Sequence, residues 1–413
     1  MSDNIDKPER EFDVIVWGAT GFTGRLVVEY LAANYPQGKP LRWAVGARNR
    51  DKLQRVLDDI SFDGTRPEII VADSHDPASL ASLANRTRVV LTTVGPYAKY
   101  GSELVRACAT SGTDYCDLTG EAQWIRRMID THEKAARESG ARILMSCAFD
   151  SVPSDIGVHC LQKNALRLHE QTCKDIIMLV RAMKGGASGG TIASILNLVD
   201  EARRDRSIAR LVTDPYALNP EGLREGPDGR DQDGAVFNEK AGVWTGPFIM
   251  AGINTRTVRR TNALLGYPYG KDFRYSEATI TGAGLSGRLK ATMAGIGLKA
   301  FVVLAAIPIL RKLLLQPFLP APGEGPSREE RENGYFNLLM IGTLANDQVL
   351  RLRIKGDRDP GYGSTSKMLA ETAVCLALDD PRVAGGFWTP AAALGDHLLS
   401  RLVRNAGLTF ELE

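Results

Sequence analysis

The sequence predicts an α/β protein with a Rossmann-type, doubly wound parallel sheet and a second α+β domain that contains an antiparallel or mixed sheet. Three observations predict this fold class. Short apolar runs alternate with segments of helical periodicity over the first 150 residues, and a glycine-rich turn directly follows the first run. After Phe149 this alternation ends and longer strand-like segments appear.

Six apolar runs near the N-terminus are typical of buried parallel strands, which carry apolar side chains on both faces. They lie at 12–17, 41–48, 67–73, 88–95, 113–118 and 141–149. The segments between them have the spacing of amphipathic helices, at 24–34, 50–58, 77–85, 101–111 and 122–139. This alternation predicts a nucleotide-binding Rossmann domain over residues 12–150, preceded by a flexible arm at 1–11.

The composition excludes several classes of protein. Lys and Arg number 51 against 49 Asp and Glu, and a formal net charge of +2 gives no electrostatic footprint for nucleic acid. The first residues have mixed charges and no apolar core, so we expect a cytoplasmic protein without a secretory signal. The six cysteines form no CxxC pair, so we expect buried thiols and no metal site.

The segment GATGFTG after the first strand predicts a phosphate-binding turn. Gly18 would make the tight turn, Gly21 would admit a pyrophosphate near the backbone, and Gly24 would let the helix pack closely on the sheet. The GxxGxxG spacing differs from GxGxxG and occurs in many reductases that use NADP. The alternative is a glycine-rich turn without a ligand. The residues of this segment expected to bind the cofactor are Gly18, Thr20, Gly21, Phe22, Thr23 and Gly24.

The end of the second strand indicates which dinucleotide binds. An NAD site usually has an acidic residue there for the ribose hydroxyls, whereas Arg48 occupies the corresponding place in this chain. A guanidinium suits a charge-assisted contact with a 2′-phosphate, so NADP(H) is the expected cofactor. The alternative is a solvated arginine at the start of a helix.

Two other strand ends should face the same crevice, because ligands of such sheets bind beyond the carboxyl ends of the strands. Asp73 is expected near the adenine, and Val94, Gly95 and Pro96 form a loop expected under the nicotinamide half. Tyr97 follows this loop and is a candidate proton donor, although an aromatic residue beside proline is as often a packing residue.

Several motifs together resemble the saccharopine dehydrogenase-like oxidoreductase family. They are GATGFTG, TTVGPYAKYG, GTDYCDLTGE, FDSVPSDIG, SGGTIAS, RDPGYGSTSKM and GGFWTPAAALGDHLL, and they extend over nearly the whole chain. Within that family the sequence is most similar to the bacterial trans-acting enoyl reductases. The resemblance implies reduction of a double bond in a polyketide-derived lipid when the synthase's own enoyl-reductase domain is absent or inactive.

The second domain is expected over residues 151–375, for substrate binding or dimerisation. Strands are predicted at 173–183, 273–282, 335–344 and 347–357, the last two as an antiparallel hairpin. Two helices near the end of the chain place a C-terminal segment, 376–413, against the Rossmann domain.

The segment 292–318 has an eleven-residue run without a polar side chain, from Ala300 to Leu310. A spanning helix needs about 20 apolar residues, and Lys299 and Arg311 bound this run. We therefore weigh four alternatives: an interfacial helix at the cytoplasmic face of the plasma membrane, a lid over a lipid substrate, a homodimer contact, or an ordinary buried helix.

An NADPH-dependent reductase of a lipophilic enoyl substrate is the predicted function, with Tyr97, Asp150 and Tyr362 as the catalytic candidates. Tyr115 is a further possible proton donor. No YxxxK dyad, HExxH, GxSxG or P-loop motif is present, which excludes a short-chain dehydrogenase of the usual kind, metalloproteases, hydrolases and P-loop enzymes. Two alternatives stay open: a membrane-associated NADP-binding protein without catalysis, and an amino-acid dehydrogenase of the saccharopine type.

Overall fold

The computed structural model describes residues 9–38, 40–186, 189–315, 325–379 and 381–413. Most of the expected arm at 1–11 and the last three residues of the segment 292–318 lie outside the described residues. The chain divides into two compact units. The first comprises residues 1–152 and 361–406, and the second comprises residues 153–360 and 407–413.

The first unit contains a parallel sheet of seven strands in the order β13-β6-β5-β4-β1-β2-β3. Apart from β13 this is the Rossmann order, in which the direction of strand addition reverses between β1 and β4. The strands are β1 (Phe12–Trp17), β2 (Trp43–Ala47), β3 (Glu68–Val71), β4 (Thr87–Thr92), β5 (Asp114–Cys116), β6 (Arg142–Leu144) and β13 (Gly386–Trp388). The predicted fold class is confirmed for this unit.

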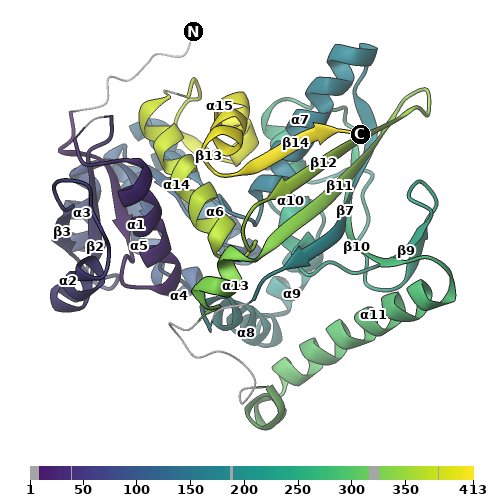
Figure 1. Ribbon diagram of the computed structural model, residues 1–413, viewed down its shortest axis with the longest axis horizontal. Helices are drawn as coiled ribbons and strands as arrows, with labels where there is room; N and C mark the ends of the chain where they lie inside the picture. The colour runs from purple at the N-terminus through teal and green to yellow at the C-terminus, as the bar shows by residue number, and fades with distance from the viewer. Residues whose placement is uncertain (1–8, 39, 187–188, 316–324, 380) are drawn as a thin grey trace. The chain divides into compact units, whose positions relative to one another are not determined.

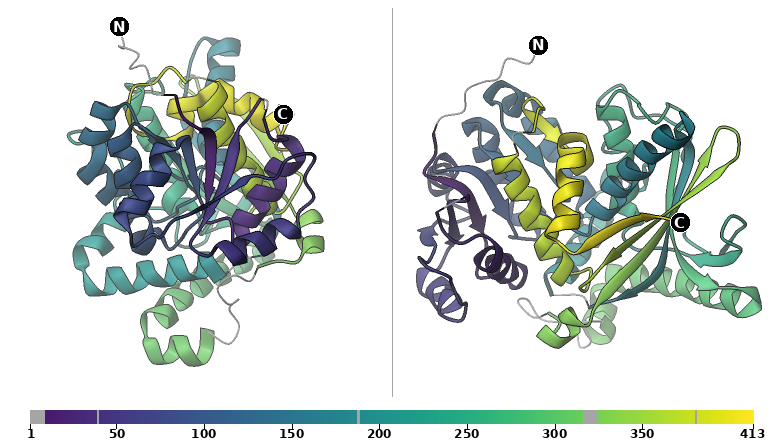
Figure 2. Two further views of the ribbon diagram at one scale, coloured as in Figure 1. Left: turned by 90° about the vertical axis from the view of Figure 1, so that its left-hand side faces the viewer. Right: turned by 45° about the horizontal axis from the view of Figure 1, so that its top comes forward.

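Helices of the first unit form two groups (Figures 1 and 2). α1 (Phe22–Asn34) packs on α14 (Gly363–Leu378), which packs in turn on α15 (Pro390–Arg404) and on the strands β1, β4 and β5. A second group comprises α3 (Pro77–Asn85), α5 (Ser102–Ser111) and α6 (Ala122–Ser139). The short α4 (Tyr97–Tyr100) precedes α5, and α2 (Arg50–Asp58) packs beside β2 and β3.

Strand β1 shows why the N-terminal runs become strands. All six of its residues are buried, because neighbouring strands flank it on both edges and helices cover its faces. Similar apolar runs form β2 and most of β4, whose residues are also buried. All six cysteines of the chain are buried and none forms a disulfide, as the sequence predicted.

The second unit contains a mixed sheet of seven strands in the order β14-β12-β11-β7-β10-β9-β8. Only β7 and β10 pair in parallel, and the other neighbours are antiparallel. The strands are β7 (Cys173–Lys184), β8 (Val236–Asn238), β9 (Val243–Gly246), β10 (Arg274–Gly282), β11 (Tyr335–Leu344), β12 (Val349–Gly356) and β14 (Leu408–Leu412). The expected hairpin is β11-β12, which pairs Thr343 with Val349.

Helices of the second unit flank this sheet. They are α7 (Val152–His169), α8 (Gly189–Arg204), α9 (Arg206–Thr213), α10 (Ala251–Leu264), α11 (Gly284–Ala306), α12 (Pro308–Leu310), the π-helical turn η1 (Arg311–Leu315) and α13 (Arg328–Glu332). In Figure 1, α11 runs past β9 along one side of this unit. The segment 292–318 is thus helical over most of its described length.

The unit boundaries differ from the predicted domain boundaries at the C-terminal end. The predicted boundary at residue 375 lies inside α14, and the whole of α14 belongs to the first unit. Conversely, β14 pairs with β12 in the second unit, so the last seven residues leave the first unit. A helix or strand pattern identifies the element but does not specify which sheet it packs on, which explains both differences.

Candidate functional site: a dinucleotide-binding turn in the first unit

The candidate site lies at the carboxyl ends of β1 and β4, where the strand order of the first sheet reverses. The loop after β1 leads into α1, and the loop after β4 leads into α4. The two loops contact each other, because the N–H of Thr93 donates a hydrogen bond to the carbonyl oxygen of Trp17 at 3.0 Å. An open α/β sheet binds its ligand at such a switch point.

Gly18 has a backbone conformation that favours glycine. Its φ is +91°, and an added Cβ would lie 2.6 Å from Cγ2 of Val94. Its N–H donates to the carbonyl oxygen of Gly46 at 2.9 Å, and its own carbonyl accepts the N–H of Gly21 at 2.9 Å. These bonds fix the turn against β2, so a side chain at Gly18 would be strained and would displace the β4 loop.

Gly24 allows α1 to approach this turn closely. An added Cβ would lie 2.2 Å from the carbonyl oxygen of Gly18 and 2.8 Å from Oγ1 of Thr93. Both distances are far below van der Waals contact, so only glycine fits. This is the close helix–sheet packing expected from the third glycine of a dinucleotide motif.

The first turn of α1 is available to an anion. Gly21 is its N-cap and, lacking a side chain, forms no capping hydrogen bond, and no acidic residue stands in the first turn. Gly21 is exposed, and Thr20, Phe22 and Thr23 are half-buried. Backbone N–H groups at a helix N-terminus bind phosphate oxygens well, so the turn fits a pyrophosphate.

Arg48 stands just after β2 and is exposed. Among the described residues it has no hydrogen-bond or ion-pair partner, which leaves its guanidinium available to a ligand. Its neighbours are occupied differently: Asn49 caps α2 by accepting the N–H of Lys52, and Arg50 donates to the carbonyl oxygen of Ile69 at 3.3 Å. Of the two arginines after β2, Arg48 is thus the one whose guanidinium has no partner among the described residues, which suits a contact with a 2′-phosphate.

Asp73 has a structural role in the loop after β3. Its Oδ1 accepts the N–H of His75 at 2.9 Å, and its own N–H donates to Oγ of Ser79 at 3.0 Å. The carboxylate therefore shapes the loop at which the adenine was predicted. Its contact with the adenine stays a prediction.

The β4 loop is fixed by a residue that the sequence did not single out. Glu121 is 2% exposed, and its carboxylate accepts the N–H of Tyr97 at 2.8 Å and of Ala98 at 3.0 Å. These are the first two amides of α4, and a carboxylate suits a helix N-terminus. Glu121 thus fixes the residues that directly follow the segment Val94–Pro96. Glu121 lies in the motif GTDYCDLTGE, but its role is visible only in the structure, where its carboxylate contacts the start of α4.

Tyr97 and Tyr115 are both buried and hydrogen-bonded inside the first unit. Tyr97 is 4% exposed and donates its hydroxyl to the carbonyl oxygen of Thr92 at 3.1 Å. Tyr115 donates to Oδ2 of Asp117 at 2.8 Å. Burial holds the pKa of each hydroxyl well above its ordinary value. This geometry favours a structural role for Tyr97 and Tyr115 over proton donation.

Asp117 connects the ends of β5 and β6. It lies in the motif GTDYCDLTGE but was not identified from the sequence as a site residue. Its Oδ1 accepts the N–H groups of Thr119 and Ser146, each at 3.0 Å. Burial raises the pKa of Asp117 to about 7, against hydrogen bonds that lower it. The carboxyl is therefore close to its titration midpoint at neutral pH.

The other two catalytic candidates lie at different places. The ring of Tyr362 packs edge-on against Phe22, the first residue of α1, with ring centroids 5.1 Å apart. Asp150 is half-buried in the turn after β6, and its carbonyl oxygen accepts the N–H of Ala148 at 3.4 Å. Tyr362 is thus brought beside the glycine turn. Their catalytic roles stay predictions.

No group of three or more potential metal ligands occurs among the residues that the structure describes. The candidate site consists of the backbone amides at the start of α1, the exposed guanidinium of Arg48 and the β4 loop, which Glu121 fixes. Groups of this kind suit an anionic ligand such as a phosphorylated dinucleotide.

Comparison with known families identifies the same region. Residues 14–144 match the family model described as the saccharopine dehydrogenase NADP-binding domain. The match begins inside β1 and ends at the last residue of β6. It thus includes the glycine turn, Arg48 and the β4 loop.

Curated relatives are similar over nearly the whole chain. A trans-acting enoyl reductase of Mycobacterium tuberculosis is 40% identical over 417 residues, which cover 95% of this chain and 96% of the relative. One of Mycobacterium ulcerans is 38% identical over 416 residues, covering 96% and 97%. Among solved structures, saccharopine dehydrogenase (L-Glu forming) of Saccharomyces cerevisiae aligns over 97% of this chain and 99% of that chain. Its TM-score is 0.52 at 13% identity, which shows a shared fold.

Proposed function

The chain belongs to the trans-acting enoyl reductase family, and on this basis we propose that it reduces the conjugated carbon–carbon double bond of a lipophilic, polyketide- or lipid-derived enoyl substrate with NADPH. The observation that carries the proposal is the glycine turn together with Arg48. Gly18 and Gly24 leave no room for side chains, and Arg48, two residues after the Gly46 that binds the turn, has no partner among the described residues.

NADPH supplies the hydride for the β-carbon when it is bound, and a proton must reach the α-carbon. Backbone N–H groups at the start of α1 would hold the pyrophosphate, and Arg48 would hold the 2′-phosphate. Glu121 keeps the β4 loop in place for the nicotinamide half. The protein thus contributes mainly position and electrostatics, together with a group that passes the proton.

We rank the candidates for the proton donor by position, because burial does not separate Tyr362, which is 3% exposed, from Tyr97, which is 4% exposed. Tyr362 lies against Phe22 at the start of α1, and Asp150 is half-buried and able to orient a water molecule. Tyr97 is engaged with Thr92 inside the unit, so we rank it below these two. We propose Tyr362 or Asp150 as the group through which the proton passes.

We further propose that the protein works in the cytoplasm, in peripheral contact with the cytoplasmic face of the plasma membrane. A substrate with a long apolar chain partitions into lipid, so a reductase at the membrane surface meets more of it than one in solution.

The experiment that tests the activity uses the full chain with NADPH deuterated at the transferable position and a long-chain 2-enoyl thioester. Deuterium at the β-carbon of a saturated product, found by mass spectrometry, would support the proposal. NADPH binding without turnover of several such enoyl thioesters would favour the NADP-binding protein without catalysis. Turnover of an amino-acid substrate of the saccharopine type instead would favour the other alternative.

A further inference from the structure

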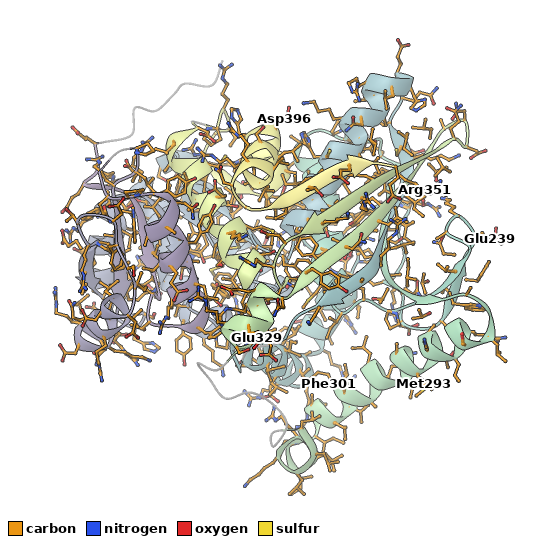
Figure 3. The ribbon with its side chains drawn as sticks, in the orientation of Figure 1. Glu239, Met293, Phe301, Glu329, Arg351 and Asp396 are labelled. Carbon is orange, nitrogen blue, oxygen red and sulfur yellow. The ribbon has the colours of Figure 1, made fainter. Side chains whose placement is uncertain are left out.

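The long helix α11 presents large apolar side chains to solvent. The exposed fractions are 81% for Leu285, 60% for Leu289, 63% for Met293, 64% for Ile296 and 55% for Val303. These five residues, called the α11 stripe below, follow one another at spacings of four, four, three and seven, so they share one face of the helix. Ile309 and Leu313, on α12 and η1, continue the exposed apolar surface beyond the helix. Met293 and Phe301 mark the helix in Figure 3.

The opposite face of α11 consists of small residues that contact the second unit. Gly287, Ala291 and Gly295 are buried, and a Cβ added to Gly246 of β9 would lie 3.4 Å from Cα of Ala291. A Cβ added to Gly295 would lie 2.9 Å from the carbonyl oxygen of Asp233. The helix is therefore seated closely by its small residues, and its large apolar residues point away from the unit.

This arrangement excludes one of the alternatives considered from the sequence. An ordinary core helix turns its largest apolar side chains inward, because burying them supplies most of the stabilisation. In α11 only 17% of the most apolar 18-residue window is buried. The segment is thus not an ordinary buried helix.

Basic residues flank the α11 stripe on both sides. At about 100° per residue, Arg288 and Lys299 lie on one flank of the stripe and Lys290 lies on the other. Lys299 pairs with Asp233 at 3.1 Å at the surface, and Arg288 lies over the ring of Trp244. Lys290 is exposed and has no ion-pair partner among the described residues. The sequence contains no acidic residue from 278 to 323.

We propose that α11, with α12 and η1, is a docking surface for a membrane rich in anionic lipids, and that the helix lies flat in the headgroup region. An apolar stripe flanked by lysine and arginine is the composition of an interfacial helix, in which the cations extend to the lipid phosphates. The absence of acidic residues from 278 to 323 matches an anionic surface.

Two other arrangements fit less well. The mean hydropathy of 1.6 and the 23-residue length would allow α11 to cross a membrane, but one side of the helix packs on β9 and β10. Crossing would carry these strands, with the open edge of the sheet, into hydrocarbon, where unpaired backbone groups are costly. Lys299 and Arg311 are paired with Asp233 and Asp200. Pairing with a second copy would nevertheless bring together the Lys290 side chains of two chains, which have no ion-pair partner among the described residues.

The proposal deepens the peripheral location given above by naming the surface and the lipid chemistry, and its test is independent of enoyl reduction. The full chain is floated with vesicles of equal parts phosphatidylglycerol and phosphatidylcholine, and with vesicles of phosphatidylcholine alone. Neither NADPH nor substrate is added, so a failed reductase assay leaves this result standing. Light scattering of the lipid-free protein reports its oligomeric state.

Three variants make the test specific to α11. Replacing Leu289, Met293 and Ile296 together by Asp should weaken vesicle binding by at least about 100-fold, because three apolar side chains no longer enter the interface. Lys312 of η1 is exposed as well. Lys290→Gln with Lys312→Gln should weaken binding to the anionic vesicles about 25-fold, at about fivefold per cation. The matched control is Leu166→Asp with Leu168→Asp, which changes two exposed leucines of α7 and should leave binding unchanged.

We expect the wild type to bind only the vesicles that contain phosphatidylglycerol. The stripe variant should lose this binding and the α7 control should keep it. Both variants should have the circular dichroism and thermal unfolding of the wild type. Absence of wild-type binding to the anionic vesicles would overturn the proposal. So would equal binding by the wild type and the stripe variant. A wild-type dimer that the stripe variant converts to a monomer, without vesicle binding by either, would assign the surface to self-association instead.

Discussion

A Cβ atom on Gly24 would lie 2.2 Å from the carbonyl oxygen of Gly18, so the first turn of α1 rests directly on the backbone of the loop that precedes it. The loop has little freedom to yield. The N–H of Gly18 is bound to Gly46, and Oγ1 of Thr93 donates to the same carbonyl oxygen of Gly18 at 3.3 Å. The turn and the helix therefore form one rigid element, which suits the proposed binding of a phosphate.

Gly24→Ala tests this element. The added methyl group must displace either α1 or the Gly18 turn, so we expect NADPH affinity to fall at least about tenfold and the free energy of unfolding to fall by about 1–3 kcal/mol. Quenching of intrinsic fluorescence measures the affinity, since Trp17 ends the strand before the turn. Gly252→Ala is the control, because an added Cβ there meets no atom within 4 Å. Wild-type affinity in Gly24→Ala would contradict the assignment.

Arg48→Glu should change the preference between the two dinucleotides. If Arg48 holds the 2′-phosphate, its loss removes a charge-assisted contact and adds repulsion, so NADPH binding should weaken by about 10- to 100-fold while NADH binding changes little. Parallel titrations with both nucleotides measure the ratio. Arg55→Glu, farther along α2, should leave that ratio unchanged. An equal effect on NADPH and NADH would show that another residue binds the phosphate.

The N-terminal strands and the glycine turn were predictable because local sequence determines them. A run such as 12–17 is apolar on both faces, and only a central parallel strand buries both. β13 was missed, because its three residues pair in parallel with β6 from far along the chain and are too short to show a period.

The supporting residues of the site were harder to predict than the turn itself. Glu121 and Asp117 act by accepting backbone N–H groups, which leaves no motif in the sequence. Their partners Tyr97 and Ser146 are more than 20 residues away. Tyr97 was a candidate proton donor because it follows the loop expected under the nicotinamide. Its hydroxyl is buried because α4 packs against Trp124, which the sequence does not show.

The buried carboxyl of Asp117 should give the first unit a pH-dependent stability. Its pKa is raised to about 7 by burial, whereas in the unfolded chain it should be about 4. Between these values the folded state holds a proton that the unfolded state has lost, so this contribution to stability is full below about pH 4 and is lost as the pH rises through 7. Asp117→Asn should abolish that slope.

Urea unfolding at a series of pH values measures this effect as the difference between the variant and the wild type. From about pH 5 to about pH 8, the free energy of unfolding of the variant should rise relative to that of the wild type by an amount on the order of 1–4 kcal/mol. Fluorescence is a suitable probe, because four of the five tryptophans (Trp17, Trp43, Trp124 and Trp388) belong to the first unit. A difference that does not change with pH would show that Asp117 stays ionised when folded.

The C-terminal helices are joined to α1 by a buried charge cluster. Glu371 of α14 is fully buried and accepts hydrogen bonds from the hydroxyls of Tyr30 at 2.8 Å and Tyr35 at 2.7 Å. Arg401 of α15 pairs with Glu371 at 3.3 Å and with Asp379. Arg401→Leu leaves a buried carboxylate without its cation, so we expect a loss of about 3–5 kcal/mol of unfolding free energy.

Arg404→Leu is the matched control for this cluster. Arg404 lies one turn later on α15, is exposed and donates to the carbonyl oxygen of Ser400, so its replacement should cost less than about 0.5 kcal/mol. Adding Glu371→Gln to Arg401→Leu should recover part of the loss, because the unpaired charge is then removed. Equal costs for the two arginines would show that the cluster contributes nothing beyond a surface pair.

Tyr362→Phe tests the proposed role of Tyr362, which lies beside the glycine turn, as the proton donor. The variant keeps the ring that packs against Phe22 and removes only the hydroxyl. If that hydroxyl passes the proton to the α-carbon, the kcat for enoyl reduction should fall by about 10²- to 10⁴-fold, while NADPH affinity stays the same.

Asp150→Asn is the parallel test of the other candidate. Tyr97→Phe should lower stability by about 1 kcal/mol, the usual value of one hydrogen bond, with little change in kcat. The pH dependence of kcat separates donation from packing, because a residue that only packs leaves the profile unchanged. A large loss of kcat in Tyr97→Phe alone would reverse this ranking and assign the role to Tyr97.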